Sequence, residues 1–351
     1  MKFLKKTKTG LGLDIGGSSL KFLEIQQTNS QTKIVGMSDV PLPKGLMVND
    51  TIADPKTLVY LLKSALQKPE FGKFSSLPVC VSLPESKSFV RVIQLPSMRE
   101  SEIETAVPVE AESFIPLPIN QVYLDWQILS TKADKLEILI IASPKNFVDG
   151  YLTILDEAKL DVSAMEVESQ SCHRALIPKT SQVTNLLVDI DSFRTSLIMV
   201  ENGNLQFTSS IPLAGNSFTE AIAKLLGVSG QKAELVKRTV GIANTSEYPN
   251  LRSSLDSLVK SLSAEIKNII KFHSEHSKNK VESLILAGGG AKAKNLAEIL
   301  NAEFVSEQIK VELGDPFVNL PNLTSPPMAK FDALNFTTAI GLALRNLEEN
   351  N

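Results

Sequence analysis

Two segments of the sequence combine aspartate, glycine, hydroxyl and cationic residues in an order suited to binding phosphate and a metal ion. The first segment is Asp14-Ile15-Gly16-Gly17-Ser18-Ser19, followed by Lys21. Glycines let backbone amides approach an anion, serine hydroxyls add donors, and a lysine on the next strand adds a positive charge. An aspartate at the end of a strand is suited to hold a water molecule on Mg²⁺. Taken alone, this segment fits a hairpin turn that requires glycine equally well.

The second segment repeats this order near the middle of the chain. It reads Asp189-Ile190-Asp191-Ser192-Phe193-Arg194-Thr195. Asp189 would face Asp14 across a metal ion, while Thr195 and nearby amides would donate to phosphate. A phosphate tail held between two lobes requires two facing loops of this kind. The carboxylate of Asp191 replaces an expected glycine and would repel phosphate unless it turns away or meets the metal.

Two further segments carry weaker signals. The run Gly288-Gly289-Gly290 lies between a predicted strand and a helix that follows at once, which permits close approach to a nucleoside or phosphate but also suits a tight joint. It lacks the G-x-G-x-x-G pattern of dinucleotide-binding folds. Glu234 and Lys237 lie one helical turn apart and suit a ribose hydroxyl or an adenine edge, although most such pairs are surface ion pairs.

The elements that carry these segments form an internal repeat. In each half a strand ends at an aspartate, a turn follows, and two more strands return, over residues 11–40 and again over residues 185–211. An Asn202-Gly203 pair makes the last hairpin turn. One repeat at half-chain spacing indicates duplicated lobes that face a cleft. A length of 351 residues is also suited to two lobes.

Between the two copies the pattern predicts a strand, a helix and two strands, punctuated by prolines and followed by an amphipathic helix. This block reads as a module inserted in the first lobe. In the second half, helices are predicted over residues 217–226, 230–240, 251–276, 294–300 and 331–347, and a strand over residues 281–287.

Composition argues against several classes of protein. A net charge of −3, with no basic face on the helices, argues against binding nucleic acid. Cys80 and Cys172 lack C-x-x-C spacing and read as buried thiols in a reducing compartment, which favours the cytoplasm. No apolar stretch is long enough to span a bilayer, and the start lacks the apolar core of a signal peptide. Any membrane association is therefore expected to come through a partner.

The motifs DIGGSSLK, DIDSFRT, AELVKR and LAGGGAK resemble, in order and spacing, those of the superfamily of actin, sugar kinases and heat-shock chaperone ATPases. The module after Leu83-Pro84 resembles the subdomain that marks the bacterial families FtsA and PilM. The PilM family is favoured by GLDIGGSSLKFLEI, VPVEAESFIPLP, VYLDWQIL and MEVESQSCHRAL. FtsA-like proteins end in an amphipathic membrane-binding helix, whereas this sequence stops in acidic and amide residues after Arg345.

The resemblance implies an α/β fold with two actin-like lobes, each a copy of a ribonuclease-H-like unit, and an inserted strand-helix-strand-strand subdomain. The first lobe would span residues 1–183 and contain the insert at about residues 84–160. The second lobe would span residues 184–351, with a helical subdomain on the nucleoside side at about residues 217–283. The final helix, residues 331–347, would return to the first lobe.

The resemblance also implies a site for ATP and Mg²⁺. Phosphate contacts would come from both loops, through Gly16, Gly17, Ser18, Ser19, Lys21, Ser192, Arg194 and Thr195. Asp14 and Asp189 would hold Mg²⁺ through water. Gly288, Gly289 and Gly290 would approach the nucleoside, Glu234 and Lys237 the ribose and adenine, and Gly215 would belong to the same nucleotide site. Glu168 would be the catalytic carboxylate that positions water.

PilM-like proteins bind ATP in this cleft and hold the N-terminal tail of the inner-membrane protein PilN in a groove beside the insert. The resemblance thus implies a cytoplasmic scaffold, recruited to the inner membrane, that works with other pilus assembly proteins and either stays single or forms a homo-oligomer. Asp191, and Asn216 where FtsA-like chains tend to have glycine, imply at most slow ATP hydrolysis. The alternatives are an FtsA-like adaptor, a small-molecule kinase or ATPase with Glu168 as base, and a protein that has lost nucleotide binding.

Overall fold

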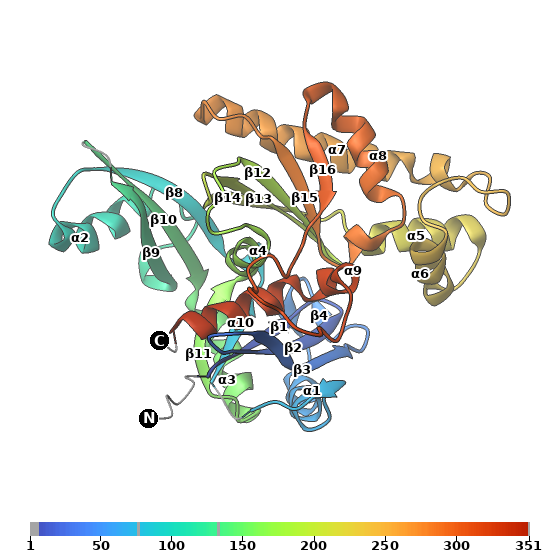
Figure 1. Ribbon diagram of the computed structural model, residues 1–351. Helices are drawn as coiled ribbons and strands as arrows, with labels where there is room; N and C mark the ends of the chain where they lie inside the picture. The colour runs from blue at the N-terminus through green and yellow to red at the C-terminus, as the bar shows by residue number, and fades with distance from the viewer. Residues whose placement is uncertain (1–6, 76–77, 132–133, 350–351) are drawn as a thin grey trace.

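The computed structural model describes residues 7–75, 78–131 and 134–349. Figure 1 shows one sheet-centred lobe at the bottom of the view, a second at the top, and a small group of strands and a helix that projects to the left. Within the described residues, no helix is long and apolar enough to cross a membrane.

The first lobe is built on a six-stranded sheet in the order β11-β7-β1-β2-β3-β6. Its strands are β1 (Lys8–Ile15), β2 (Ser19–Gln27), β3 (Thr32–Pro41), β6 (Phe71–Gly72), β7 (Val79–Leu83) and β11 (Val162–Val167). A separate hairpin pairs β4 (Met47–Val48) with β5 (Thr51–Ile52). Apolar side chains of α1 (Pro55–Gln67) and α3 (Lys145–Glu157) share a core with β1, β2 and β7. The strands follow the alternation of apolar residues that the sequence shows.

The helices α4 (Glu168–Leu176) and α10 (Thr337–Glu349) pack together on a second core with strands of both lobes. A Cβ atom at Gly10 of β1 would lie 2.1 Å from the carbonyl oxygen of Ala343. A Cβ atom at Gly341 of α10 would lie 1.9 Å from the carbonyl oxygen of Ser171. Glycine at these positions therefore permits the C-terminal helix to lie directly against β1 and α4 (Figure 1).

The end of the chain differs from the single helix predicted over residues 331–347. A short helix α9 (Lys330–Ala333) is followed by a 3₁₀ turn (Leu334–Phe336), and only then does α10 begin. Figure 1 shows α10 crossing the lower lobe. The turn places Asn335 on the cleft side of the helix, where it lines a cavity described below.

The second lobe is built on the strands of an eight-stranded sheet in the order β16-β15-β12-β13-β14-β8-β10-β9. Its own strands are β12 (Asn185–Ile190), β13 (Thr195–Glu201), β14 (Asn204–Ile211), β15 (Ser283–Ala287) and β16 (Lys310–Leu313). One core contains these strands and the helices α5 (Gly215–Leu226), α6 (Gly230–Thr239), α7 (Leu251–His276) and α8 (Leu296–Phe304). The three antiparallel strands β12, β13 and β14 repeat the arrangement of β1, β2 and β3.

The insert has the predicted order of strand, helix, strand, strand. It comprises β8 (Phe89–Pro96), α2 (Glu100–Ala111), β9 (Val122–Thr131) and β10 (Lys135–Pro144). The predicted range of about 84–160 also included α3, but α3 packs in the core of the first lobe. Although the chain enters the insert from the first lobe, β8 pairs with β14 of the second lobe at Arg91 and Phe207. The insert thus extends the sheet of the second lobe.

Candidate nucleotide-binding site

The two predicted phosphate loops form the same turn. In the first loop, residues 16–19, the amide of Gly16 donates to the carbonyl oxygen of Ser19 at 3.1 Å. In the second loop, residues 191–194, the amide of Asp191 donates to the carbonyl oxygen of Arg194 at 2.9 Å. Asp191 therefore occupies in its loop the position that glycine occupies in the first.

The two loops meet across the gap between the lobes. The hydroxyl oxygens of Ser18 and Ser192 lie 2.6 Å apart. The ring of Phe193 covers Gly17 so closely that a Cβ atom at that glycine would lie 2.5 Å from the ring. Behind this contact lies a cavity of about 110 Å³, called here the phosphate cavity. Ligand pockets usually measure about 300–1,000 Å³, so a whole nucleotide requires the lobes to move apart at this contact.

Lys21 supplies a positive charge to the phosphate cavity. Its ammonium nitrogen lies 3.5 Å from Asp14 Oδ2, and only 12% of its side chain is exposed. Burial lowers the pKa of Lys21, but Asp14, Asp39 and Asp191 outweigh this effect and raise it above the ordinary value. Lys21 is therefore charged at neutral pH and surrounded by carboxylates that a phosphate group would have to replace.

Three oxygen atoms around the cleft are buried without a hydrogen-bond partner in the part of the chain that the structure describes. They belong to Asp39, Asp189 and Asn335. The other carboxylate oxygen of Asp189 accepts from the thiol of Cys172 at 3.1 Å. Burial raises the pKa of Asp189 to about 6. Because a buried acceptor without a donor is costly, these oxygens suit the water molecules around a bound cation.

A cation in this cleft would need ligands beyond the protein. No three His, Cys, Asp or Glu side chains among the described residues lie close enough together to hold a metal ion. Asp14, 6% exposed, accepts from the hydroxyl of Ser82 at 3.1 Å. Mg²⁺ commonly keeps several waters and binds one or two carboxylates with substrate phosphate. The acidic residues present fit that pattern.

Glu168 begins α4 beside the second loop and is linked to a carboxylate that the sequence did not indicate. Its Oε2 atom accepts from the amide of Glu85 at 3.1 Å, and Glu85 Oε2 accepts from the amide of Ser169 at 3.2 Å. The hydroxyl of Thr208, on β14 of the second lobe, also donates to Glu85. Burial raises the pKa of Glu168 well above its ordinary value, with added effects of Asp191 and Asp14.

Glu168 and Glu85 line a second, smaller cavity of about 30 Å³ beside Gly17, called here the water-sized cavity. A cavity of about 10–15 Å³ is enough for one water molecule. Asp191 and Arg194 line the same space. The arrangement is therefore suited to place a water molecule beside a phosphate held by the first loop.

Glu85 makes the stability of the fold depend on pH. Burial raises the pKa of Glu85 above its ordinary value of 4.5, so above pH 4.5 the folded protein keeps a proton that the unfolded chain releases. The contribution of Glu85 to the free energy of unfolding is therefore fully present below pH 4.5, and it is lost as the pH rises through the pKa of Glu85 in the folded protein. Glu85→Gln, which mimics the neutral acid, is expected to unfold about 2–4 °C above the wild type at about pH 8.

Thermal unfolding followed by circular dichroism between about pH 5 and pH 8 measures this effect. The midpoints of the two proteins should approach each other as pH falls. A constant difference at every pH would show that Glu85 does not titrate in this range. Glu104→Gln, on the exposed face of α2, is a control that removes the same charge.

Of the pair predicted to contact the ribose, Glu234 and Lys237, the lysine is buried. Lys237 is 4% exposed, and its ammonium donates to the carbonyl oxygen of Gly215 at 3.0 Å and to the hydroxyl of Thr219 at 2.9 Å. Glu234 lies 2.7 Å from the same nitrogen. Lys237 thus fastens α6 to the start of α5, while the next residue, Arg238, lines the phosphate cavity.

The glycine run packs on the end of β12. Gly288 has a φ of +77°, and a Cβ atom there would lie 2.5 Å from Asp189 Oδ1. The sequence predicted a helix over residues 294–300 directly after this run, but the structure differs. The last glycine begins a 3₁₀ turn, Gly290–Lys292, and α8 starts at Leu296, after Asn295 with its left-handed φ of 68°. Gly289 alone of the three lines the phosphate cavity.

Thr195 lies deeper than a phosphate contact requires. Its hydroxyl donates to the carbonyl oxygen of Leu213 at 2.6 Å, and the residue is 0% exposed. This bond joins the start of β13 to the segment before α5. The second loop therefore presents Ser192 and Arg194 to the cavities, and Thr195 supports the loop from behind.

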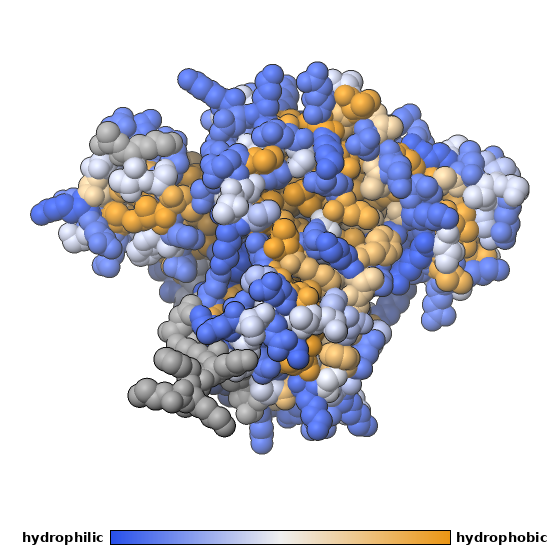
Figure 2. Space-filling view, viewed as in Figure 1, coloured by the Kyte–Doolittle hydropathy of each residue, from blue (hydrophilic) through white to orange (hydrophobic). Residues whose placement is uncertain are grey.

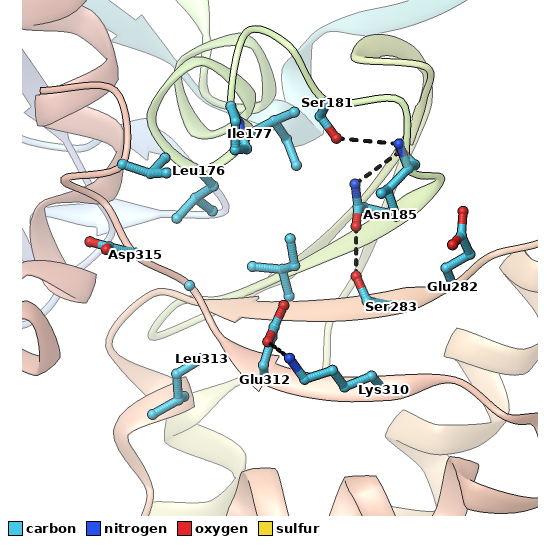
Figure 3. Close-up of a pocket in the computed structure, with 15 residues that line it drawn as sticks. Leu176, Ile177, Ser181, Asn185, Glu282, Ser283, Lys310, Glu312, Leu313 and Asp315 are labelled. Atoms are coloured by element: carbon cyan, nitrogen blue, oxygen red, sulfur yellow. Dashed lines mark hydrogen bonds and ion pairs between the residues drawn. The ribbon is translucent and has the colours of Figure 1, made fainter. Parts of the chain in front are cut away.

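Larger hollows lie outside the cleft, and two of them border the second lobe. One, of about 510 Å³, lies between the segment after α4 and the strands β15 and β16 (Figure 3). Its lysine, Lys310, pairs with Glu312, and Glu282 and Asp315 add further negative charge. The other, of about 610 Å³, separates β8 from α7. The size of a cavity alone therefore does not indicate a nucleotide site, and the candidate site rests on the paired loops.

Two sheets of matching topology that face a cleft, with an aspartate-ended turn from each, define an actin-like fold. The solved MreB 5 of Spiroplasma citri bound to AMPPNP is similar in fold, with 13% identity, a TM-score of 0.57 and 98% of each chain covered. A chain of the PilM–PilN type IV pilus biogenesis complex is 26% identical, with a TM-score of 0.79, over 96% of this chain and 98% of that one.

The family model for the type IV pilus assembly protein PilM matches residues 12–347. The chain belongs to the PilM family. The cell division protein FtsA of Bacillus subtilis is 23% identical over 268 residues, which are 68% of this chain. The chain spans 59% of the length of that FtsA.

Proposed function

We propose that the chain is a cytoplasmic scaffold of type IV pilus assembly that binds ATP with Mg²⁺ between its lobes. The observation that carries the nucleotide part is the pair of equivalent loops, which meet at Ser18 and Ser192 with the charged Lys21 beside them. Phosphates would contact the first loop, Lys21, Ser192 and Arg194. When bound, Mg²⁺ would neutralise phosphate charge, with Asp14 and Asp189 holding its waters.

The second part of the proposal is a protein partner. The solved chain with 26% identity belongs to a complex of PilM with PilN, which supports a partner related to PilN for this chain. We propose that the N-terminal tail of such an inner-membrane protein binds beside the insert and recruits the scaffold, with other pilus assembly proteins, to the inner membrane. The protein itself need not insert in the bilayer.

The insert offers a surface for this tail. Its strand β9 is the last strand of the eight-stranded sheet, and Tyr123 and Ile128 on it are 48% and 41% exposed. The hydroxyl of Tyr123 donates to Asp149 of α3 at 3.0 Å, so this strand lies where the insert meets the first lobe. Figure 2 shows apolar side chains gathered on the insert at the left of the view. An extended tail can pair with an open strand edge.

Two calorimetric titrations test the proposal. ATP with Mg²⁺ is expected to bind with micromolar to low millimolar affinity, and excess chelator should abolish most of the heat. A synthetic N-terminal tail of the PilN-like protein should bind, while a scrambled peptide of the same composition should not. If ATP does not bind at millimolar concentration, the alternative hypothesis, a protein that has lost nucleotide binding, is supported instead. Failure of the tail alone would leave a nucleotide-binding protein with another partner.

A phosphate-release assay on the same samples tests the hypothesis that the protein hydrolyses ATP. A water-sized cavity lined by Glu168 is the observation that favours slow hydrolysis. Rapid release that Glu168→Gln abolishes would support an active ATPase. Release no faster than the background would support binding without turnover, which Asp191 favours because it takes the place of a glycine in the second loop.

A further inference from the structure

The hairpin β4–β5 of the first lobe carries a carboxylate across to the second lobe. Its two turn residues, Asn49 and Asp50, have left-handed φ angles of 49° and 58°. Such a two-residue turn suits a tight hairpin and holds its side chains in a defined direction. The pairing of Met47 with Ile52 closes the hairpin, and Leu46 anchors it in the core of the first lobe.

Asp50 binds two donors beside the water-sized cavity. Its Oδ2 atom lies 2.8 Å from Nε of Arg194, which belongs to the second phosphate loop. The hydroxyl of Ser86 donates to the same oxygen. Asp50 is 15% exposed and Arg194 35% exposed, so the pair is shielded more than a surface ion pair. The three residues line the cavity together with Gly17 and Glu168.

A carboxylate that accepts from an arginine and a hydroxyl at the edge of a phosphate site has the chemistry of a bound phosphate group. Both are anions with oxygen acceptors, and arginine binds either one. A terminal phosphate carries more charge than a carboxylate and has a third oxygen. It can therefore displace the carboxylate of Asp50 from its two donors, Arg194 and Ser86. This replacement requires the phosphate to reach beyond the first loop to the cavity beside Gly17.

We propose that Asp50 is a built-in competitor for the terminal phosphate of a nucleoside triphosphate, because it occupies Arg194 and Ser86 when that phosphate is absent. The inference rests on the proposed nucleotide site. It assigns Asp50 a role in selectivity: a triphosphate releases Arg194 from Asp50, whereas a shorter diphosphate leaves the pair intact. Breaking the pair also removes one contact between the lobes, so only the triphosphate would loosen them at this point.

The test compares nucleotide affinities of the full chain and of Asp50→Asn. Asparagine tolerates the left-handed φ of this position, so the hairpin should keep its shape. With Mg²⁺ present, Asp50→Asn is expected to bind ATP about tenfold more tightly, because a charge-assisted competitor has been removed. Its affinity for ADP should change by less than about threefold. Asp315→Asn, which removes the same charge from an exposed pair with Lys330, should leave both affinities unchanged.

A double-mutant cycle with Arg194→Gln separates competition from a general effect of charge. If Asp50 competes for Arg194, the tenfold gain disappears when Arg194 is already absent. An equal gain for ATP and ADP, or a gain that persists in Arg194→Gln, would overturn the inference while leaving the nucleotide site in place. Absence of ATP binding by the wild type and by Asp50→Asn would overturn the nucleotide site and the inference together.

Discussion

Lys21→Met is expected to lower the affinity for ATP with Mg²⁺ by at least about 100-fold, because it removes the one lysine among the described residues that line the phosphate cavity. The same change leaves Asp14, Asp39 and Asp191 without the cation whose pKa they raise. Removing one member of a buried ion pair costs about 3 kcal/mol or more. The free energy of unfolding should therefore fall by about that amount.

Calorimetry gives the affinity, and urea unfolding gives the stability of the same preparations. Titrations should be made at a temperature at which unfolding data show the variant to be folded. Lys310→Met removes a lysine from an exposed pair with Glu312 and should change neither quantity. Wild-type affinity in Lys21→Met would remove this lysine from the phosphate site.

Gly341→Ala is expected to lower the free energy of unfolding by about 3 kcal/mol, at the upper end of the range for overpacking. The added methyl group would lie 1.9 Å from a backbone oxygen of α4, which cannot move as a side chain can. Alanine is otherwise the better helix former by about 1 kcal/mol, so the loss reflects the contact between α10 and α4.

Gly150→Ala provides the matched control. Gly150 also lies inside a helix, α3, but nothing lies within 4 Å of the Cβ atom that alanine would add. This change should raise the free energy of unfolding by about 0.5–1 kcal/mol. Equal effects of the two substitutions in urea unfolding would contradict close packing of α10 on α4.

The sequence predicts the central features of this fold because they repeat. An aspartate at a strand end, a turn and a returning strand occur twice, and this repetition is enough to indicate two lobes. The long helix predicted over residues 251–276 coincides with α7. Residues whose role depends on neighbours along one strand or turn, such as Lys21 beside Asp14, can be recognised in this way.

The rest of the candidate site depends on residues brought together by the packing of the lobes. Glu85 follows a buried strand and Asn335 precedes a helix, and neither lies in a recognisable motif. Asp39 does not depend on the packing of the lobes, because it lies opposite Lys21 in the hairpin of β2 and β3. Sequence alone also favoured a surface position for Lys237, and only the fold shows that the carbonyl oxygen of Gly215 and the hydroxyl of Thr219 bury its ammonium group.

The shared sheet has a consequence for any attempt to divide the protein. Cutting the chain between residues 183 and 184 would place β8 and β14 on separate fragments and leave each with an open strand edge beside apolar residues. Such edges pair with whatever strand is available, so the isolated fragments should aggregate. Expressed together, the same fragments should find each other through β8 and β14 and form a soluble complex.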